Sequence, residues 1–166
     1  MIVIGVDPGA GTTGYGVVAQ RGGAVSLLEC GVIRTDTAKP LAARLRDIFE
    51  GLGEVLDRHR PAAIAVEHVF HGKNARSSLI LGHARGAVLL AAALRDVPVA
   101  EYSPAEIKVA VTGSGRATKE QVQFMVQRLL RLRTPPAPAD AADGVAIALC
   151  HCNASALEAR ISGRPA

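Results

Sequence analysis

The chain opens with Ile2-Val3-Ile4-Gly5-Val6-Asp7-Pro8-Gly9, a short apolar run that ends in one carboxylate. Its β-branched residues, followed by proline and glycine, predict a buried β-strand. An acid at the end of such a strand is costly to bury unless it is paired or bound to a metal. We therefore interpret Asp7 as the first member of a metal-binding acidic cluster and expect its partners further along the chain.

Residues 9–14, Gly-Ala-Gly-Thr-Thr-Gly, match the G-x-G-x-x-G dinucleotide-binding pattern. That motif requires a helix to begin within it, so that its N-terminus can receive the pyrophosphate. Residues 15–19 instead continue as an apolar strand, and residues 24–35 read as a third strand. The glycines therefore predict a hairpin.

From Pro40 to Arg60 the apolar residues recur at intervals of three and four, which predicts an amphipathic helix. Residues 63–67 follow as a buried strand that again ends in an acid, Glu67. A strand, helix and strand in this order predict a right-handed crossover and parallel pairing. We therefore expect Asp7 and Glu67 at the same edge of one sheet.

The last predicted helix begins near Ala139 and continues to Ala159. Asp140 and Asp143 are three residues apart, so they share a face in its first turn. Capping of the helix is an alternative role for Asp140 alone. The elements predicted before it are a helix over 77–94, a strand over 97–100, a helix over 104–111 and a helix that Thr118 opens.

The 77–94 helix has apolar or small residues on most of its sides, which is typical of a buried helix or a subunit interface. In a chain of 166 residues we favour an interface, with Leu81, Ala84 and Val88 in it. The length predicts a single domain over 1–160 with a tail over 161–166.

The composition predicts a soluble cytoplasmic protein with no membrane association. No apolar run is long enough to cross a bilayer, and the first strand lacks the basic flank of a signal peptide. Three cysteines do not make a disulfide framework. Two of them lie in Cys150-His151-Cys152, where consecutive helical residues diverge, so we favour helix packing over a zinc site.

Four carboxylates brought together repel one another, and a hard divalent cation with oxygen ligands compensates them. Magnesium is the expected ion, and two ions roughly 3.5–4 Å apart can clamp a phosphodiester during hydrolysis. The net charge of +4 is consistent with a polyanionic partner. Candidate phosphate-binding cations in loops or at helix starts are Lys73, Arg76, Lys108, Arg116 and Lys119, and Phe70 is either a base-stacking or a core residue.

Several blocks resemble the RuvC family of bacterial Holliday junction resolvases. They are residues 4–9, 13–16, 67–70, 73–75, 82–86 and 140–148, in the family's order and across nearly the whole chain. Two departures are His68, where relatives often carry glutamine, and His71-Gly72, which replaces a less polar pair.

The resemblance implies a ribonuclease H-like α/β fold, with a mixed five-stranded sheet flanked by helices. It also implies a homodimer that nicks two opposed strands of four-way junction DNA with magnesium, for which manganese can substitute. The catalytic acids implied are Asp7, Glu67, Asp140 and Asp143. Phe70 would stack at the junction centre, Lys108 and Lys119 would contact DNA, and RuvA and RuvB would be partners in branch migration.

Three alternatives can be weighed against this function. A nucleotide-binding protein of the actin and sugar-kinase superfold needs a second phosphate loop and a second half-domain, which 166 residues do not accommodate. A non-catalytic DNA-binding module leaves four acids facing DNA without a role. Another nuclease of the same fold, such as a ribosomal-RNA processing enzyme, is the closest competitor on chemistry alone.

Overall fold

The computed structural model describes residues 1–68 and 74–162. Phe70 and Lys73, both predicted DNA contacts, lie outside the described residues, as does His71.

Five strands of the described chain form one mixed sheet in the order β3-β2-β1-β4-β5. β1 and β2 pair antiparallel, as do β2 and β3, whereas β4 and β5 join in parallel with β1. The predicted hairpin is therefore confirmed. The strands over 24–34 and 63–67 run parallel, as predicted, but they do not pair with each other, because β2 and β1 lie between them and β4 pairs with β1. The strands are β1 (Ile2–Asp7), β2 (Thr12–Arg21), β3 (Ala24–Arg34), β4 (Ala63–Glu67) and β5 (Val99–Tyr102).

The register of the sheet brings the two strand-ending acids to one edge. Val6 of β1 is the partner of Val66 of β4, so Asp7 and Glu67 follow side by side. The expectation that Asp7 and Glu67 lie at the same edge is confirmed, although it is β1, and not the strand directly before the helix, that pairs with β4.

The strand predicted over 97–100 begins and ends two residues later than expected. Val97 completes the turn after a helix, because its N–H donates to the carbonyl of Ala92 (3.1 Å). Pro98 has no N–H to donate to a neighbouring strand, so only its carbonyl oxygen takes part, by accepting a hydrogen bond from the N–H of Ile64 (2.9 Å). β5 therefore starts at Val99.

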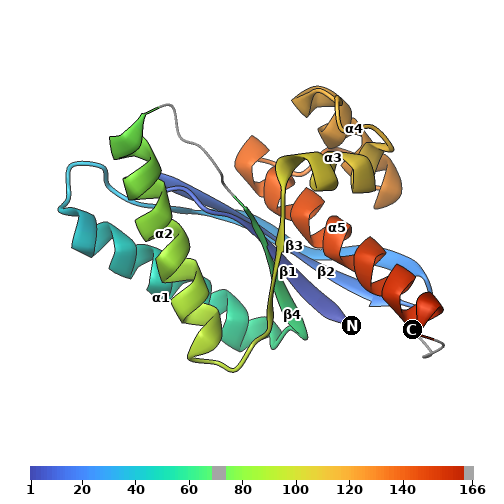
Figure 1. Cartoon of the computed structure of the whole chain (residues 1–166), viewed down its shortest axis with the longest axis horizontal. Helices are drawn as coiled ribbons and strands as arrows, with labels where there is room; N and C mark the ends of the chain where they lie inside the picture. The colour runs from blue at the N-terminus through green and yellow to red at the C-terminus, as the bar shows by residue number, and fades with distance from the viewer. Residues whose placement is uncertain (69–73, 163–166) are drawn as a thin grey trace.

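The helices form two layers, one on each face of the sheet (Figure 1). α1 and α2 pack together on one face, whereas α5 covers the other face and carries α3 and α4 on its outer side. Their bounds are α1 (Leu41–His59), α2 (Ala75–Ala93), α3 (Pro104–Thr112), α4 (Lys119–Leu129) and α5 (Ala139–Ile161). The last residue of α5 is thus the first residue of the predicted tail.

Close packing of α5 on the sheet depends on glycines. A Cβ at Gly14 of β2 would overlap the carbonyl oxygen of Asp140, and a Cβ at Gly5 of β1 would overlap that of Gly144. Glycine lets the two backbones touch. The glycines of the first hairpin therefore bring the first turn of α5 directly against β1 and β2.

The structure changes the prediction for the face of α2. Ala84 and Val88, two of the predicted interface residues, are fully buried in the core that α2 shares with α1 and the sheet. A side chain covered by its own chain has no surface left for a second subunit. Leu81 is half-buried, and the large apolar side chains that α2 exposes are Leu79 and Leu90, followed by Leu94 at its C-cap.

None of the helices within the described residues is long and apolar enough to cross a membrane. The packing interpretation of Cys150-His151-Cys152 is confirmed: both thiols are free and buried in the core. The His151 ring instead bonds to the hydroxyl groups of Tyr102 (Nδ1, 2.8 Å) and Ser155 (Nε2, 3.2 Å).

Candidate active site

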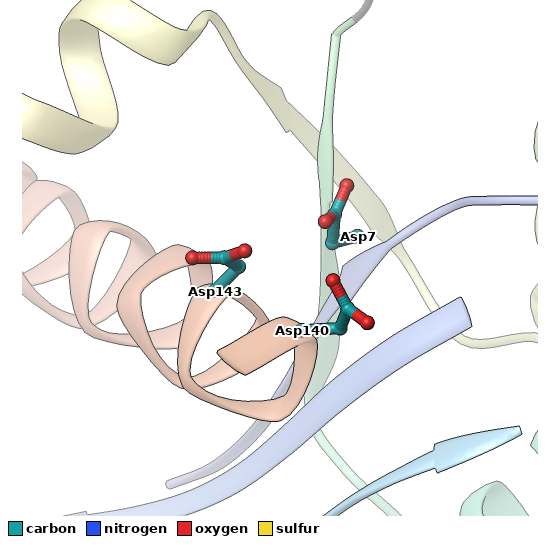
Figure 2. A group of neighbouring side chains, drawn as sticks. All are labelled: Asp7, Asp140 and Asp143. Atoms are coloured by element: carbon teal, nitrogen blue, oxygen red, sulfur yellow. The ribbon is translucent and has the colours of Figure 1, made fainter. Parts of the chain in front are cut away.

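Three carboxylates from two distant parts of the chain converge at the edge of the sheet. Asp7 ends β1, and Asp140 and Asp143 lie on the first turns of α5 and face it (Figure 2). Each offers one oxygen, and these three oxygens lie within 4.8 Å of one another. All three side chains are half-buried.

Asp140 does not cap α5. The N-cap is Pro138, which makes no side-chain capping bond, and Asp140 lies inside the first turn. Acids in this turn are favoured by the partial positive charge of the helix N-terminus. The alternative in which Asp140 only caps the helix is therefore wrong.

The fourth predicted acid, Glu67, joins the group through Asp7. Burial raises the pKa of Asp7 from 3.8 to about 7, with further contributions from the charges of Glu67 and Asp143 and from a hydrogen bond shared with Glu67. Burial also raises the pKa of Glu67. In the folded chain Asp7 and Glu67 therefore resist ionisation when no cation is bound beside them.

Two lysines line a pocket of about 210 Å³ together with Asp7, Glu67 and Asp143. Lys119, at the start of α4, donates to Asp143 (Nζ to Oδ2, 2.6 Å). Lys108 of α3 lines the same pocket, and the charges of both lysines act to lower the pKa of Glu67. Arg76 in the first turn of α2 and Arg116 in the loop before α4 are exposed.

The donor set fits a hard divalent cation. Carboxylate oxygens are the ligands that Mg²⁺ and Mn²⁺ prefer, and ligands on opposite sides of such ions lie about 4 to 5 Å apart. The spread of the three aspartate oxygens is of this size. A bound cation would also offset the burial and the like charges that together raise the pKa of Asp7.

Three residues that support this site carry no sequence signal that identifies them. The hydroxyl group of Thr13 donates to the carbonyl of Gly9, and Thr35 and Arg44 donate to the carbonyl of Ala10. Arg44 lies on the predicted amphipathic helix, where a polar residue is ordinary. Its contact with a loop 34 residues earlier becomes visible only in the fold.

Comparison with known proteins gives a consistent result. Residues 3–151 match the family model described as crossover junction endodeoxyribonuclease RuvC. The RuvC of Pelotomaculum thermopropionicum is 49% identical over 153 residues, covering 92% of this chain and 93% of that protein. The RuvC of Pseudothermotoga lettingae is 47% identical over 162 residues, covering 98% of this chain and 100% of that protein.

Solved structures agree in fold. The structure of Thermus thermophilus RuvC in complex with a Holliday junction substrate superposes with a TM-score of 0.91 at 40% identity, covering 95% of this chain and 96% of that one. The yeast mitochondrial Holliday junction resolvase, at 15% identity and a TM-score of 0.67, covers 93% of this chain and 78% of that one and shares the fold alone. The fold is ribonuclease H-like, as the resemblance implies. The chain belongs to the RuvC family of crossover junction endodeoxyribonucleases.

Proposed function

We propose that this protein is a Holliday junction resolvase, which cuts two opposed strands of four-way junction DNA at symmetric positions in recombination and repair. The observation that carries the proposal is the convergence of Asp7, Asp140 and Asp143 beside Glu67. This cluster lies in a chain that is 40% identical to a RuvC solved with a Holliday junction substrate.

We assign Asp7, Glu67, Asp140 and Asp143 as catalytic acids that hold Mg²⁺, with two ions per site and Mn²⁺ as a substitute. The chemistry that bound divalent ions supply is activation of a water molecule and stabilisation of the leaving oxygen. The acids themselves are held by three elements, β1, β4 and α5, and that preorganisation limits rearrangement during the reaction.

The lysines at the pocket provide positive charge for the DNA backbone. Lys119 neutralises Asp143 in the free protein, and phosphate oxygens compete for the same ammonium group when DNA arrives. Lys108 offers a second ammonium group in the lining of the same pocket. We further propose that Arg76, Arg116, Lys73 and Phe70 contact the junction outside the pocket, with Phe70 stacking on bases at its centre.

Symmetric cutting of two strands requires two active sites, so we propose a homodimer. The exposed leucines of α2, Leu79 and Leu90, favour this helix as the interface, together with half-buried Leu81. Replacing Leu81 or Leu79 with glutamate should produce monomers in sedimentation experiments. A dimer that persists in both variants would exclude α2 as the interface.

Two further proposals follow from family membership. RuvA and RuvB, the partners in branch migration, would deliver the junction to this enzyme. The cytoplasm, where such a DNA substrate is found, would be its place of action.

The decisive experiment incubates a synthetic four-way junction with the protein and Mg²⁺ and maps the cuts at nucleotide resolution. Paired nicks at matching positions on opposed strands are the expected result, with no cutting when Mg²⁺ is chelated. A linear duplex of the same sequence serves as the control substrate. Equal cutting of the duplex, or cutting of structured RNA in preference to the junction, would contradict the proposal and favour another nuclease function.

A further inference from the structure

The backbone loop between Asp7 and β2 is held by an unusual set of donors. The carbonyl oxygen of Ala10 accepts a hydrogen bond from the Thr35 hydroxyl group (2.6 Å). It also accepts two from the guanidinium group of Arg44, through Nη2 (2.6 Å) and Nε (3.1 Å). A carbonyl oxygen has two lone pairs, so three donors fill its accepting capacity.

The charge of Arg44 has no acidic partner in the part of the chain that the structure describes. No carboxylate of residues 1–68 or 74–162 lies within ion-pair distance of it. A partly buried guanidinium group ordinarily pairs with a carboxylate. Here two of its N–H groups are aimed at one neutral backbone atom, which makes a stronger hydrogen bond than an uncharged donor would.

The neighbours of Ala10 are fixed as well. Thr13, whose side chain is fully buried, donates to the carbonyl of Gly9 (2.9 Å) and accepts from its N–H (3.3 Å). The N–H of Thr35 donates to the carbonyl of Gly11 (3.0 Å). Three consecutive loop residues are thus tied to β2, to the residue after β3 and to α1.

This loop is where displacement of Asp7 would be easiest. Up to Asp7 the chain is held in the sheet, where Asp7 faces Gly14 of β2. Beyond Asp7 no ladder restrains it, while Asp140 and Asp143 bring like charges within 4.8 Å. Repulsion between those charges pushes the Asp7 carboxylate away from the other two. A tether in the adjoining loop opposes this movement.

We propose that Arg44 and Thr35 are positioning residues for metal binding: they fix the loop over residues 9–11 so that Asp7 stays facing Asp140 and Asp143. They thereby set the affinity of the acidic cluster for Mg²⁺. The inference rests on the proposed function only in taking this cluster as the Mg²⁺ site. Neither residue is assigned contact with the metal or with DNA.

The test measures Mg²⁺ affinity directly, by calorimetry on the DNA-free protein and by the rise in thermal unfolding temperature with Mg²⁺. Arg44→Met and Thr35→Val should each weaken Mg²⁺ binding by about 10-fold, the size of effect seen when groups that orient metal ligands are removed. Cleavage should need correspondingly more Mg²⁺ but approach the wild-type kcat at saturation. Junction affinity without metal should stay unchanged.

Conservative and remote variants separate positioning from general stability. Arg44→Lys and Thr35→Ser each keep a donor and should recover part of the lost affinity. The control is Arg95→Met, because Arg95 bonds to the carboxylate of Asp57 (2.7 and 2.9 Å) and to a helix carbonyl at the far end of α2. This variant should unfold at a lower temperature yet bind Mg²⁺ as the wild type does.

Several results would overturn the proposal. Wild-type Mg²⁺ affinity in both Arg44→Met and Thr35→Val would remove the positioning role, and so would an equal loss of affinity in the Arg95 control. A loss of metal-free junction binding in Arg44→Met would make Arg44 a DNA contact instead. If the wild-type protein fails to cut junctions while the variants bind Mg²⁺ weakly, the proposed function fails and the positioning role stands.

Discussion

The sheet carries two clusters of ionisable side chains, and the fold shifts the pKa values of their central acids in opposite directions. In the acidic cluster, Asp7 and its three acidic neighbours meet like charges, and burial with those charges raises the pKa of Asp7 to about 7. In the second cluster, the Glu29 cluster, Glu29 of β3 accepts hydrogen bonds from three partners. These are Tyr15 (2.8 Å), Arg58 (2.8 Å to each oxygen) and His59 (2.7 Å).

Burial alone would raise the pKa of Glu29, but its hydrogen-bonding partners outweigh that effect and lower it to about 2. The Glu29 cluster is therefore complete within the chain and joins β2 and β3 to the end of α1. The acidic cluster is incomplete, because among the described residues Lys119 is the one cation that forms an ion pair with it. An acidic group that the fold leaves uncompensated is suited to binding a cation, and one that the fold satisfies is suited to stability.

The largest expected effect is on catalysis. Asp7→Asn should lower the rate of junction cleavage by roughly a thousandfold or more, because metal-assisted stabilisation of the transition state is worth several kcal/mol. Junction binding should persist. Asp36→Asn, at an exposed turn, is the matched control and should cut normally. If Asp7→Asn cuts well, the acidic cluster is not the catalytic site; if it loses binding as well, Asp7 is structural.

Asp7→Asn lowers activity, but it should make the metal-free protein more stable. Unfolded Asp7 ionises near 3.8 and folded Asp7 near 7, so the folded state binds the extra proton and loses stability as the pH rises between these values. Asp7→Asn should therefore be more stable than the wild type at pH 8 in EDTA, by up to about 4 kcal/mol. Urea unfolding at pH 4 and pH 8 measures this difference. A variant that is less stable at pH 8 would refute it.

The Glu29 cluster should respond with the opposite sign. The folded pKa of about 2 lies below the ordinary 4.5, so the carboxylate contributes stability above pH 4.5 and loses it as the pH falls toward 2. Glu29→Gln should cost about 1–2 kcal/mol at pH 7, after solvent screening of a side chain that is 26% exposed. In this variant the free energy of unfolding should fall less steeply between pH 4.5 and pH 2, and Mg²⁺ affinity should equal that of the wild type. A change in Mg²⁺ affinity would mean that the two clusters are coupled.

The smallest effect should come from the lysine that bridges the acidic cluster and DNA. Lys119→Ala should weaken junction binding severalfold and reduce the slope of log K against log salt by about 0.9, the value for one phosphate contact. Arg21→Ala removes the same charge from the exposed last residue of β2 and should leave the slope unchanged. An unaltered slope for Lys119→Ala would remove this residue from the DNA interface.

Periodicity was sufficient to predict most elements of the fold, because strands and helices here follow clear patterns of burial. α1 buries Ile48, Leu52 and Leu56 on one face, as its spacing predicts. β5 was misplaced because its boundary depends on Pro98 and on a contact between Val97 and the end of α2. The interface prediction failed for Ala84 and Val88 because an apolar helix face does not reveal whether α1 or another subunit covers it.

The sequence by itself determined the chemistry of this protein: which acids end apolar strands, which acids open the last helix, and which cations lie near helix starts. Those features depend on local order along the chain. The tertiary structure alone decided that Arg44 and Thr35 hold the loop after Asp7, and that Glu29 is satisfied while Asp7 is not. The physical reason is that a charge is compensated or left uncompensated by neighbours in space, which here come from residues far apart in the sequence.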